Sequence, residues 1–257
     1  MIGALRDIAG EIGARLVQWR EQGAMHGHWE GTQFKAEADT MAHRAWLEAL
    51  AVLAPEIPVR SEEGEPPGAA LCSGPYFLID PIDGTASYAH GFPGYVTQVA
   101  LMESGRPTLA VVHAPVFGQT WHSVRGEGAF LNDRLLVRND GEGARMLLID
   151  NYPEPRGVAA TLVRDLPASG YVESGSIGLK ACRVADGSVD LFVKDVVVRD
   201  WDLAPCDLIL HEAGCWISDG SGQALEYDSN PEIHGVIAAR DPDVAARALE
   251  IVKRGGK

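Results

Sequence analysis

The sequence is poor in cysteine, and its cysteines have no spacing typical of a zinc or redox centre. There are four in 257 residues, none forms a CxxC motif, and the nearest two, Cys206 and Cys215, are nine residues apart. A chain of this length buries a large core without covalent cross-links. Two disulfides are the alternative, but we expect reduced, mostly buried thiols, as in a cytoplasmic protein.

Long apolar runs are also missing. No run approaches the roughly 18 residues of a membrane span. Acidic Asp7 and Glu11 interrupt the first apolar stretch, which is not typical of a signal peptide. We therefore expect a cytoplasmic protein with no membrane partner.

Positive charge is in deficit. Lys and Arg total 22 and Asp and Glu total 36, which gives a net charge of −14. Such a surface repels phosphate backbones and anionic lipid, so we expect no nucleic acid polymer as a partner. A small anion can still bind where positive charge gathers locally. The hydrophobic share of 46% is ordinary for a globular protein.

Hydrophobic periodicity divides the chain into two halves. Apolar residues at three- and four-residue steps predict a helix over 2–21 and a second helix that ends before Pro55. A polar, glycine-bearing segment at 138–144 follows a series of short strands, and strands alternate with helices after it. We therefore expect an α+β domain, 1–140, followed by an α/β domain, 141–257. The expected strands are 76–79, 96–102, 108–113, 121–124, 129–131, 146–149, 189–194, 215–218 and 235–239, and the later helices are 156–166, one that ends at 185, 202–213 and one that begins at 242.

Three acidic segments carry the candidate chemistry. Residues 61–65 read Ser-Glu-Glu-Gly-Glu, residues 80–85 read Asp-Pro-Ile-Asp-Gly-Thr, and Trp201-Asp202 opens a predicted helix. In the second segment a buried strand delivers Asp80, and Asp83 follows three residues later, so both carboxylates can face one space. Mg²⁺ prefers such oxygen ligands and is commonly shared with a substrate phosphate. If these carboxylates bind a metal ion, the metal ion can in turn bind a phosphate. An acidic protein could then have an anionic substrate.

Each segment also has a simpler interpretation. Asp-Pro and Asp-Gly are common turn formers, acidic loops are usually solvated, and Asp202 alone would be an ordinary helix cap. It is their combination, in this order, that carries information.

The combination resembles the inositol monophosphatase superfamily, which includes inositol monophosphatases, 3′(2′),5′-bisphosphate nucleotidases and fructose-1,6-bisphosphatase-like enzymes. The resemblance covers nearly the whole chain. It rests on Glu62-Glu63, on Asp-Pro-Ile-Asp-Gly-Thr at 80–85, on Gly175-Ser176, and on Trp-Asp-Leu-Ala at 201–204 with Glu-Ala-Gly at 212–214. It implies α+β followed by α/β, arranged as a layered α-β-α-β-α sandwich of the sugar-phosphatase type.

The resemblance also implies roles for individual residues. Glu62, Asp80 and the Ile82 carbonyl would hold one Mg²⁺, and Asp80, Asp83 and Asp202 a second. Glu62 would reach a third ion through water. Thr85 with Asp39 would orient or deprotonate the attacking water, and the amides of Gly84 and Thr85 would bind the phosphate. The family pattern further implies that Mn²⁺ can replace Mg²⁺, that Li⁺ and Ca²⁺ inhibit, and that the protein is a homodimer.

The segment before Asp39 departs from the family pattern. Many relatives have Val-Thr-x-x-Asp there, whereas this chain has Lys35-Ala36-Glu37-Ala38-Asp39. Because this Thr is missing, the family pattern does not fully support the third metal ion or the activation of water in this segment.

Substrate choice depends on fewer residues. Ser61 before Glu62-Glu63, and Lys180 shortly after Gly175-Ser176, resemble the nucleotidase branch, where Lys180 would pair a second phosphate. Alternatively, Lys180 is a solvated helix residue. Asp195 instead matches an acidic residue that binds sugar hydroxyls in inositol monophosphatases, or is an exposed carboxylate beside Lys194. The expected substrate-binding residues are Asp83, Gly175, Ser176, Lys180 and Asp195.

The sequence thus predicts a Mg²⁺-dependent phosphomonoesterase that acts on 3′-phosphoadenosine 5′-phosphate. Inositol 1-phosphate is the alternative substrate. An alternative of another class is a non-catalytic protein that binds metal or phosphate on the same fold.

Overall fold

The computed structural model describes residues 1–24, 26–30, 33–64, 74–138, 146–227 and 230–255. Two helices, α1 (Ile2–Glu21) and α2 (Glu37–Leu53), form the first layer. The periodicity of α1 places Leu5, Ile12 and Leu16 in the core, so this helix is confirmed where the sequence predicts it.

A seven-stranded sheet forms the second layer. Only β3 and β4 are parallel, and every later neighbour is antiparallel. Side chains of β4 alternate between the two faces: Phe77 and Ile79 pack toward α1 and α2, and Tyr76 and Leu78 pack toward the other side. The strands, in spatial order, are β3 (Val59–Ser61), β4 (Tyr76–Asp83), β5 (Val96–Glu103), β6 (Arg106–Ala114), β7 (Gln119–Val124), β8 (Ala129–Leu131) and β9 (Arg134–Leu135).

A second sheet of five strands mixes parallel and antiparallel pairs. Its central strand β12 is parallel to β10 and antiparallel to β14. In spatial order the strands are β11 (Ala168–Glu173), β10 (Met146–Asp150), β12 (Leu191–Arg199), β14 (Glu232–Ala239) and β13 (Trp216–Asp219).

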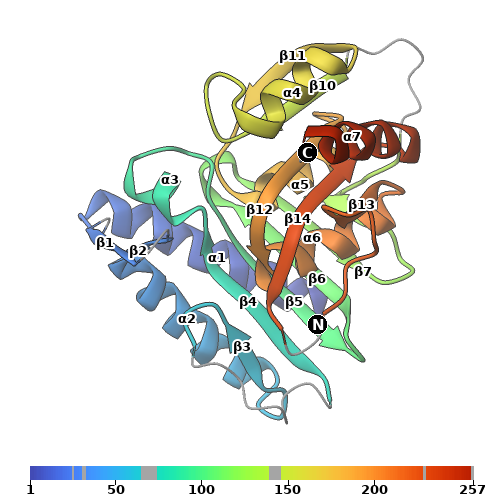
Figure 1. Cartoon of the computed structure of the whole chain (residues 1–257). Coiled ribbons are helices and arrows are strands. Elements are labelled where there is room, and N and C mark those ends of the chain that lie inside the picture. The colour runs from blue at the N-terminus through green and yellow to red at the C-terminus, as the bar shows by residue number, and fades with distance from the viewer. Residues whose placement is uncertain (25, 31–32, 65–73, 139–145, 228–229, 256–257) are drawn as a thin grey trace.

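Four further helices cover this second sheet. Helices α5 (Ile177–Ala185) and α6 (Asp200–Glu212) lie between the two sheets, and α4 (Gly157–Asp165) and α7 (Pro242–Gly255) cover the outer face. The order α1/α2, sheet, α5/α6, sheet, α4/α7 is the predicted α-β-α-β-α sandwich; in Figure 1, α2 lies at the lower left and α4 and α7 lie at the top.

The division into two domains stays a prediction. The boundary at residue 140 falls outside the described residues, and each sheet belongs to one side of it. The central core, however, is built from both sides, because Leu78 and Val112 of the first sheet pack with Leu203 of α6 and Phe192 of the second sheet.

Several elements differ from expectation. Strand β4 continues to Asp83, beyond the expected end at residue 79, and β12 continues to Arg199, beyond the expected end at residue 194. Three strands lack the apolar alternation from which a strand is predicted. They are β1 (Gly27–Glu30), its partner β2 (Gln33–Ala36) and the edge strand β11. Two single-turn helices, α3 (Thr85–Ala89) and the 3₁₀ helix Pro115–Phe117, are shorter than any helical period can resolve.

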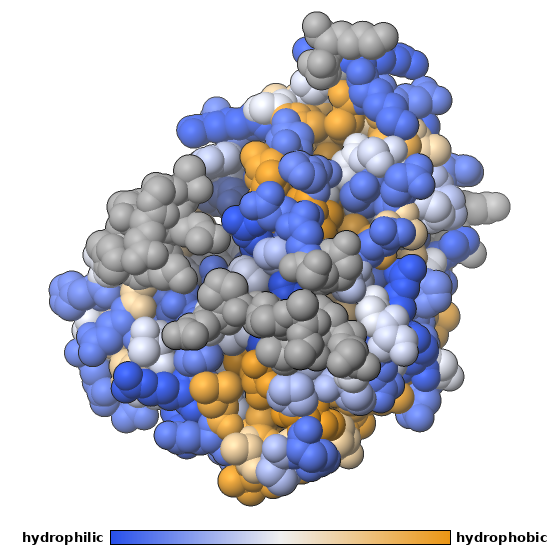
Figure 2. Space-filling model, turned by 60° about the horizontal axis from the view of Figure 1, so that its bottom comes forward, coloured by the Kyte–Doolittle hydropathy of each residue, from blue (hydrophilic) through white to orange (hydrophobic). Residues whose placement is uncertain are grey.

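The expectation of free, mostly buried thiols is confirmed for three cysteines. Cys182 and Cys206 are buried and free, and Cys215 is partly buried and free. Cys72 lies outside the described residues. Within the described ranges, no helix is both long and apolar enough to cross a membrane. The face in Figure 2 is largely hydrophilic, with apolar residues in smaller groups.

Candidate active site

A bulge at the end of β4 brings two aspartates into one place. Asp80 pairs with Gln98 of β5 and Asp83 with Val96, so Pro81 and Ile82 of β4 face the single residue Thr97. The additional residue bends the strand and turns both carboxylates the same way. A bulge in the strand thus stands where the Asp-Pro and Asp-Gly steps would also allow an ordinary turn.

Asp83 binds the start of α5. Its Oδ1 accepts the Ile177 N–H at 3.1 Å, and its Oδ2 accepts the Gly178 N–H at 2.5 Å. These amides belong to the first turn of a helix, where N–H groups have no intrahelical partner. Ser176 caps the same helix, because its Oγ accepts the Leu179 N–H at 2.9 Å.

Asp202 lies in the first turn of α6. Its Oδ2 accepts the Arg199 N–H at 2.8 Å, which caps the helix from within. The other carboxylate oxygen is directed toward β4.

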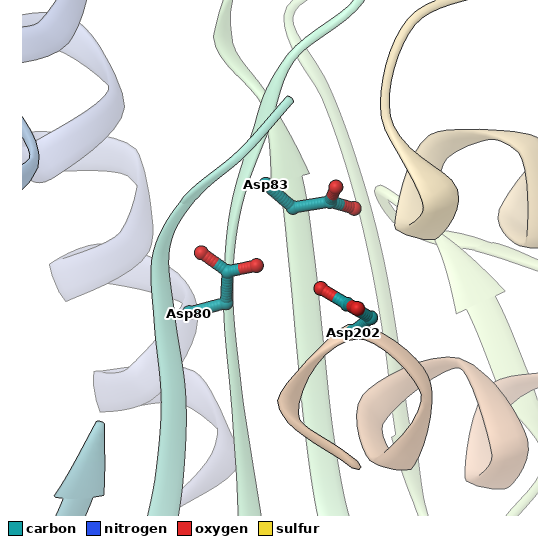
Figure 3. A group of neighbouring side chains, drawn as sticks. All are labelled: Asp80, Asp83 and Asp202. Carbon is teal, nitrogen blue, oxygen red and sulfur yellow. The ribbon is translucent and has the colours of Figure 1, made fainter. Parts of the chain in front are cut away.

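Asp80, Asp83 and Asp202 converge, as Figure 3 shows. Each offers one oxygen, and these oxygens lie within 4.8 Å of one another. Two come from the first sheet and one from the helix layer between the sheets. Three carboxylates at this spacing are the donor set that a hard divalent cation takes.

Asp80 is the least satisfied of the three. It is 1% exposed, and neither carboxylate oxygen has a hydrogen-bond partner among the described residues. Burial, then the negative charges of Glu62, Asp83, Asp202 and Asp39, raise the pKa of Asp80 well above its ordinary value. A buried carboxylate in this position is costly unless a cation pairs with it, so the residues fit a divalent metal.

The neighbouring carboxyls are shifted in the same direction. Burial, followed by the charges of Asp83 and Glu62, raises the pKa of Asp202 well above its ordinary value. Burial also raises the pKa of Asp83, which the Gly178 amide and Lys180 partly oppose. The group as a whole resists carrying three negative charges without a cation.

Thr85 and Asp39 form a hydrogen-bonded pair. The Thr85 hydroxyl lies 3.0 Å from Asp39 Oδ1 and 3.0 Å from the Ile82 carbonyl oxygen. Asp39, 2% exposed, also accepts the Ala36 N–H at 2.8 Å through Oδ2, so its carboxylate is held at the start of α2. The pair forms although the expected Thr before Asp39 is absent from the sequence.

Glu62 follows β3 directly. Its amide donates to the Ile79 carbonyl at 3.3 Å, and its charge acts on Asp80 and Asp202. Its carboxylate is partly buried and is not among the three whose oxygens cluster.

Glycines allow close contact beside the site. Gly84 has a φ of 90°, and a Cβ there would lie 3.0 Å from the Ser176 Cβ and 3.2 Å from the Gly94 oxygen. The Ser176 N–H donates to the same Gly94 oxygen at 2.6 Å. Gly175 approaches Gly94 backbone to backbone, since a Cβ on Gly94 would lie 2.5 Å from Gly175 N. The two predicted phosphate and substrate segments, 84–85 and 175–176, are therefore adjacent.

Lys180 is fully buried, so the alternative of a solvated helix residue is wrong. Its ammonium donates to the Asn151 side-chain oxygen and to the Gly175 carbonyl. Burial, then the charge of Lys194, lowers the pKa of Lys180 to about 7. Direct contact with a substrate phosphate stays a prediction.

Asp195 is exposed on β12, next to a bulge between Lys194 and Val197. It lines a cavity of about 210 Å³ whose described lining contains none of the three clustered aspartates. Its role in binding substrate also stays a prediction.

Gln98 is a residue of the site that the sequence interpretation missed. It is fully buried in β5, and its Nε2 donates to the Trp201 carbonyl at 2.9 Å and the Asp202 carbonyl at 3.3 Å. It thereby ties the first turn of α6 to the first sheet. A polar Thr97-Gln98 step inside an apolar strand was the available signal.

The three carboxylates lie between the first sheet and the helix layer of the sandwich, where they could hold a metal ion, and comparison with known proteins identifies the class as a phosphatase. Residues 2–255 match the inositol monophosphatase family. The chain belongs to the inositol monophosphatase family.

Relatives within the family carry different names. The chain is 32% identical over 226 residues to the putative Nus factor SuhB of Neisseria meningitidis serogroup A, which covers 85% of this chain and 84% of the relative. It is 30% identical over 200 residues to the 3′(2′),5′-bisphosphate nucleotidase CysQ of Aggregatibacter actinomycetemcomitans. The match covers 75% of this chain and 74% of that relative. The crystal structure of the extragenic suppressor protein suhB from Bartonella henselae shares the fold, with a TM-score of 0.83, 24% identity and 98% coverage of both chains.

Proposed function

We propose that this phosphatase is a Mg²⁺-dependent phosphomonoesterase of the bisphosphate nucleotidase type, with 3′-phosphoadenosine 5′-phosphate as its substrate. The observation that carries the metal assignment is Asp80, a buried carboxylate without a hydrogen-bond partner among the described residues, beside two further aspartates. Family membership and this group favour an enzyme over the non-catalytic alternative.

Two to three ions are proposed for the site. Glu62, Asp80 and the Ile82 carbonyl would hold one, Asp80, Asp83 and Asp202 a second, and Glu62 a third through water. Mg²⁺ bound there supplies positive charge that polarises the phosphoryl group and acidifies water. Mn²⁺ is expected to replace it, and Li⁺ and Ca²⁺ to inhibit.

Thr85 and Asp39 would handle the proton of the attacking water. Because Asp39 Oδ1 lies 3.0 Å from the Thr85 hydroxyl, that hydroxyl can donate to Asp39 and accept from water at the same time. As water attacks, Thr85 Oγ1 takes its proton and passes its own to Asp39 Oδ1. The amides of Gly84 and Thr85 would hold the phosphate oxygens.

Substrate choice rests on a relative and on three residues of this chain. The nucleotidase assignment draws on the CysQ relative, on Ser61 before Glu62-Glu63, and on the place of Lys180 behind Gly175. With its ammonium buried, Lys180 would act on substrate through the Gly175 carbonyl. Asp195 favours the second candidate, inositol 1-phosphate, because an exposed carboxylate can accept hydrogen bonds from sugar hydroxyls.

Phosphate release from a substrate panel tests the proposal. Inositol 1-phosphate, 3′-phosphoadenosine 5′-phosphate, fructose 1,6-bisphosphate and histidinol phosphate would be compared while Mg²⁺ is titrated. A preference of about ten-fold, or about 1.4 kcal/mol in the activation free energy, would settle the substrate branch. Release that is independent of Mg²⁺ would refute the metal assignment, and no release from any ester would restore the non-catalytic alternative.

A further inference from the structure

A buried ion pair lies directly behind the proposed metal site. Arg60 Nη1 and Asp200 Oδ2 are 2.8 Å apart, and the two side chains are 2% and 1% exposed. Arg60 belongs to β3, two residues before Glu62, and Asp200 begins α6, two residues before Asp202. The pair therefore joins two chain segments that each carry a proposed metal ligand.

The pair is poorly arranged for stabilising the fold. Apart from their 2.8 Å contact with each other, Nε and Nη1 of Arg60 and both carboxylate oxygens of Asp200 form no hydrogen bond of good geometry with the residues that the structure describes. Two charges taken out of water without such partners gain little net stability, and apolar replacements of similar size are often as stable or more so. A role other than stability is the better explanation for keeping both charges.

The contacts around the pair fix the first turn of α6 from two sides. The Arg60 guanidinium lies 5.8 Å from the centre of the Trp201 ring. From the opposite strand, Gln98 donates to the carbonyls of Trp201 and Asp202. Gln98 ties this turn to β5, whereas Arg60 ties it to β3, the strand that leads to Glu62.

We propose that the Arg60–Asp200 pair is a positioning device that sets the separation of Glu62 from Asp202, and hence the geometry of metal binding. This inference rests on the proposed metal site. Neither residue touches the metal or the substrate; each acts through the ligand two positions later in the chain.

The test replaces both charges at once, because removing one would leave the other buried and unpaired. The variant Arg60→Leu/Asp200→Leu should melt, in EDTA, at or above the wild-type temperature. Its Mn²⁺ affinity, measured by electron paramagnetic resonance of free Mn²⁺, should fall by about 10- to 100-fold, the usual effect of losing support behind a metal ligand. The variant Arg60→Lys keeps the positive charge but not the planar guanidinium. Its Mn²⁺ affinity should lie between that of the wild type and that of the double variant.

A matched control removes an exposed pair on α4. Arg164 and Asp165 are 2.6 Å apart and are 70% and 40% exposed, so Arg164→Leu/Asp165→Leu should leave Mn²⁺ affinity unchanged. Wild-type Mn²⁺ affinity in the Arg60→Leu/Asp200→Leu variant would overturn the inference. Should that variant fail to fold, Arg60→Lys decides, since unchanged Mn²⁺ affinity there would overturn it as well. If the wild type itself binds no Mn²⁺, it is the proposed function that fails.

Discussion

Asp80 shows how one residue can be retained at a cost to the fold. Its carboxylate is buried, has no hydrogen-bond partner in the described part of the chain, and faces negative neighbours. The protein without metal is therefore expected to be strained at this position, and a bound cation is expected to relieve the strain.

Asp80→Asn should separate these effects. In EDTA the variant should be more stable than the wild type by about 1 to 3 kcal/mol, because the amide has no charge to bury and none to repel the neighbouring carboxylates. Burial raises the pKa of Asp80 above its ordinary 3.8, so the folded wild type holds this proton longer than the unfolded chain and loses stability as pH rises above that value. The stability difference should therefore grow from pH 4 toward 7, in urea unfolding. Stabilisation by Mg²⁺ should be lost in the variant; its persistence would contradict the assignment.

Lys180 is a second residue whose surroundings decide its behaviour. With its pKa lowered to about 7, the unfolded chain binds this proton between about pH 7 and 10.5 while the folded chain does not. This contribution makes stability rise with pH across that window, and Lys180→Met should flatten the rise.

Lys180→Met also tests the substrate role. If Lys180 acts by holding Gly175, activity on 3′-phosphoadenosine 5′-phosphate and on inositol 1-phosphate should fall together. A loss restricted to the bisphosphate would instead indicate contact with its second phosphate. Phosphate release from both esters, at saturating Mg²⁺, distinguishes the two.

At the scale of elements, helices α2, α5 and α6 each begin at a carboxylate of the site. Asp39 and Asp202 each accept the amide three residues before them, at the starts of α2 and α6, and Asp83 accepts two amides of α5. Helix N-termini carry partial positive charge, which offsets some of the repulsion among these carboxylates.

Asp83 should consequently matter for both folding and activity. Asp83→Ala removes both acceptors from α5 and should cost about 1 to 3 kcal/mol of stability. Asp83→Asn keeps one acceptor and should cost less, yet both variants should abolish turnover. Thermal melting and phosphate release measure the two effects. Asp202→Asn, which also should be folded and inactive, is the control; near wild-type activity in any of these variants would contradict the metal assignment.

Sequence reasoning succeeds where a local pattern repeats and fails where distant contacts decide. The helix of residues 2–21 follows from its periodicity, and the strand around 76–79 follows from a short apolar run bounded by turn residues. Strand β11 does not, because Ser169-Gly170 carries no apolar alternation and the strand forms only by pairing with β10. The motif at 80–85 predicted that Asp80 and Asp83 lie together, but not that Asp83 would cap α5, since Ile177 is 94 residues away.

At the scale of the whole molecule, the layer of α5 and α6 joins the two sheets. Leu203 and Ile209 of α6 share one core with Leu78 and Val112 of the first sheet. The three clustered aspartates are divided across the predicted boundary at residue 140.

Cutting the folded chain should therefore leave it assembled. With a protease site introduced within 139–145, the nicked protein should elute as one species in gel filtration and retain Mg²⁺-dependent phosphate release. Burial of apolar surface from both halves in one core provides the association energy. Separation of the halves after cleavage in native buffer would show that each domain stands alone.

Gly94 and Gly175 meet backbone to backbone beside the site, with no room for a side chain on either. Neither position can therefore serve evolution as a place to vary substrate preference. A change of specificity would have to use other positions, at which a side chain has room. A designer who wishes to alter what the enzyme accepts would therefore keep both glycines and vary other residues.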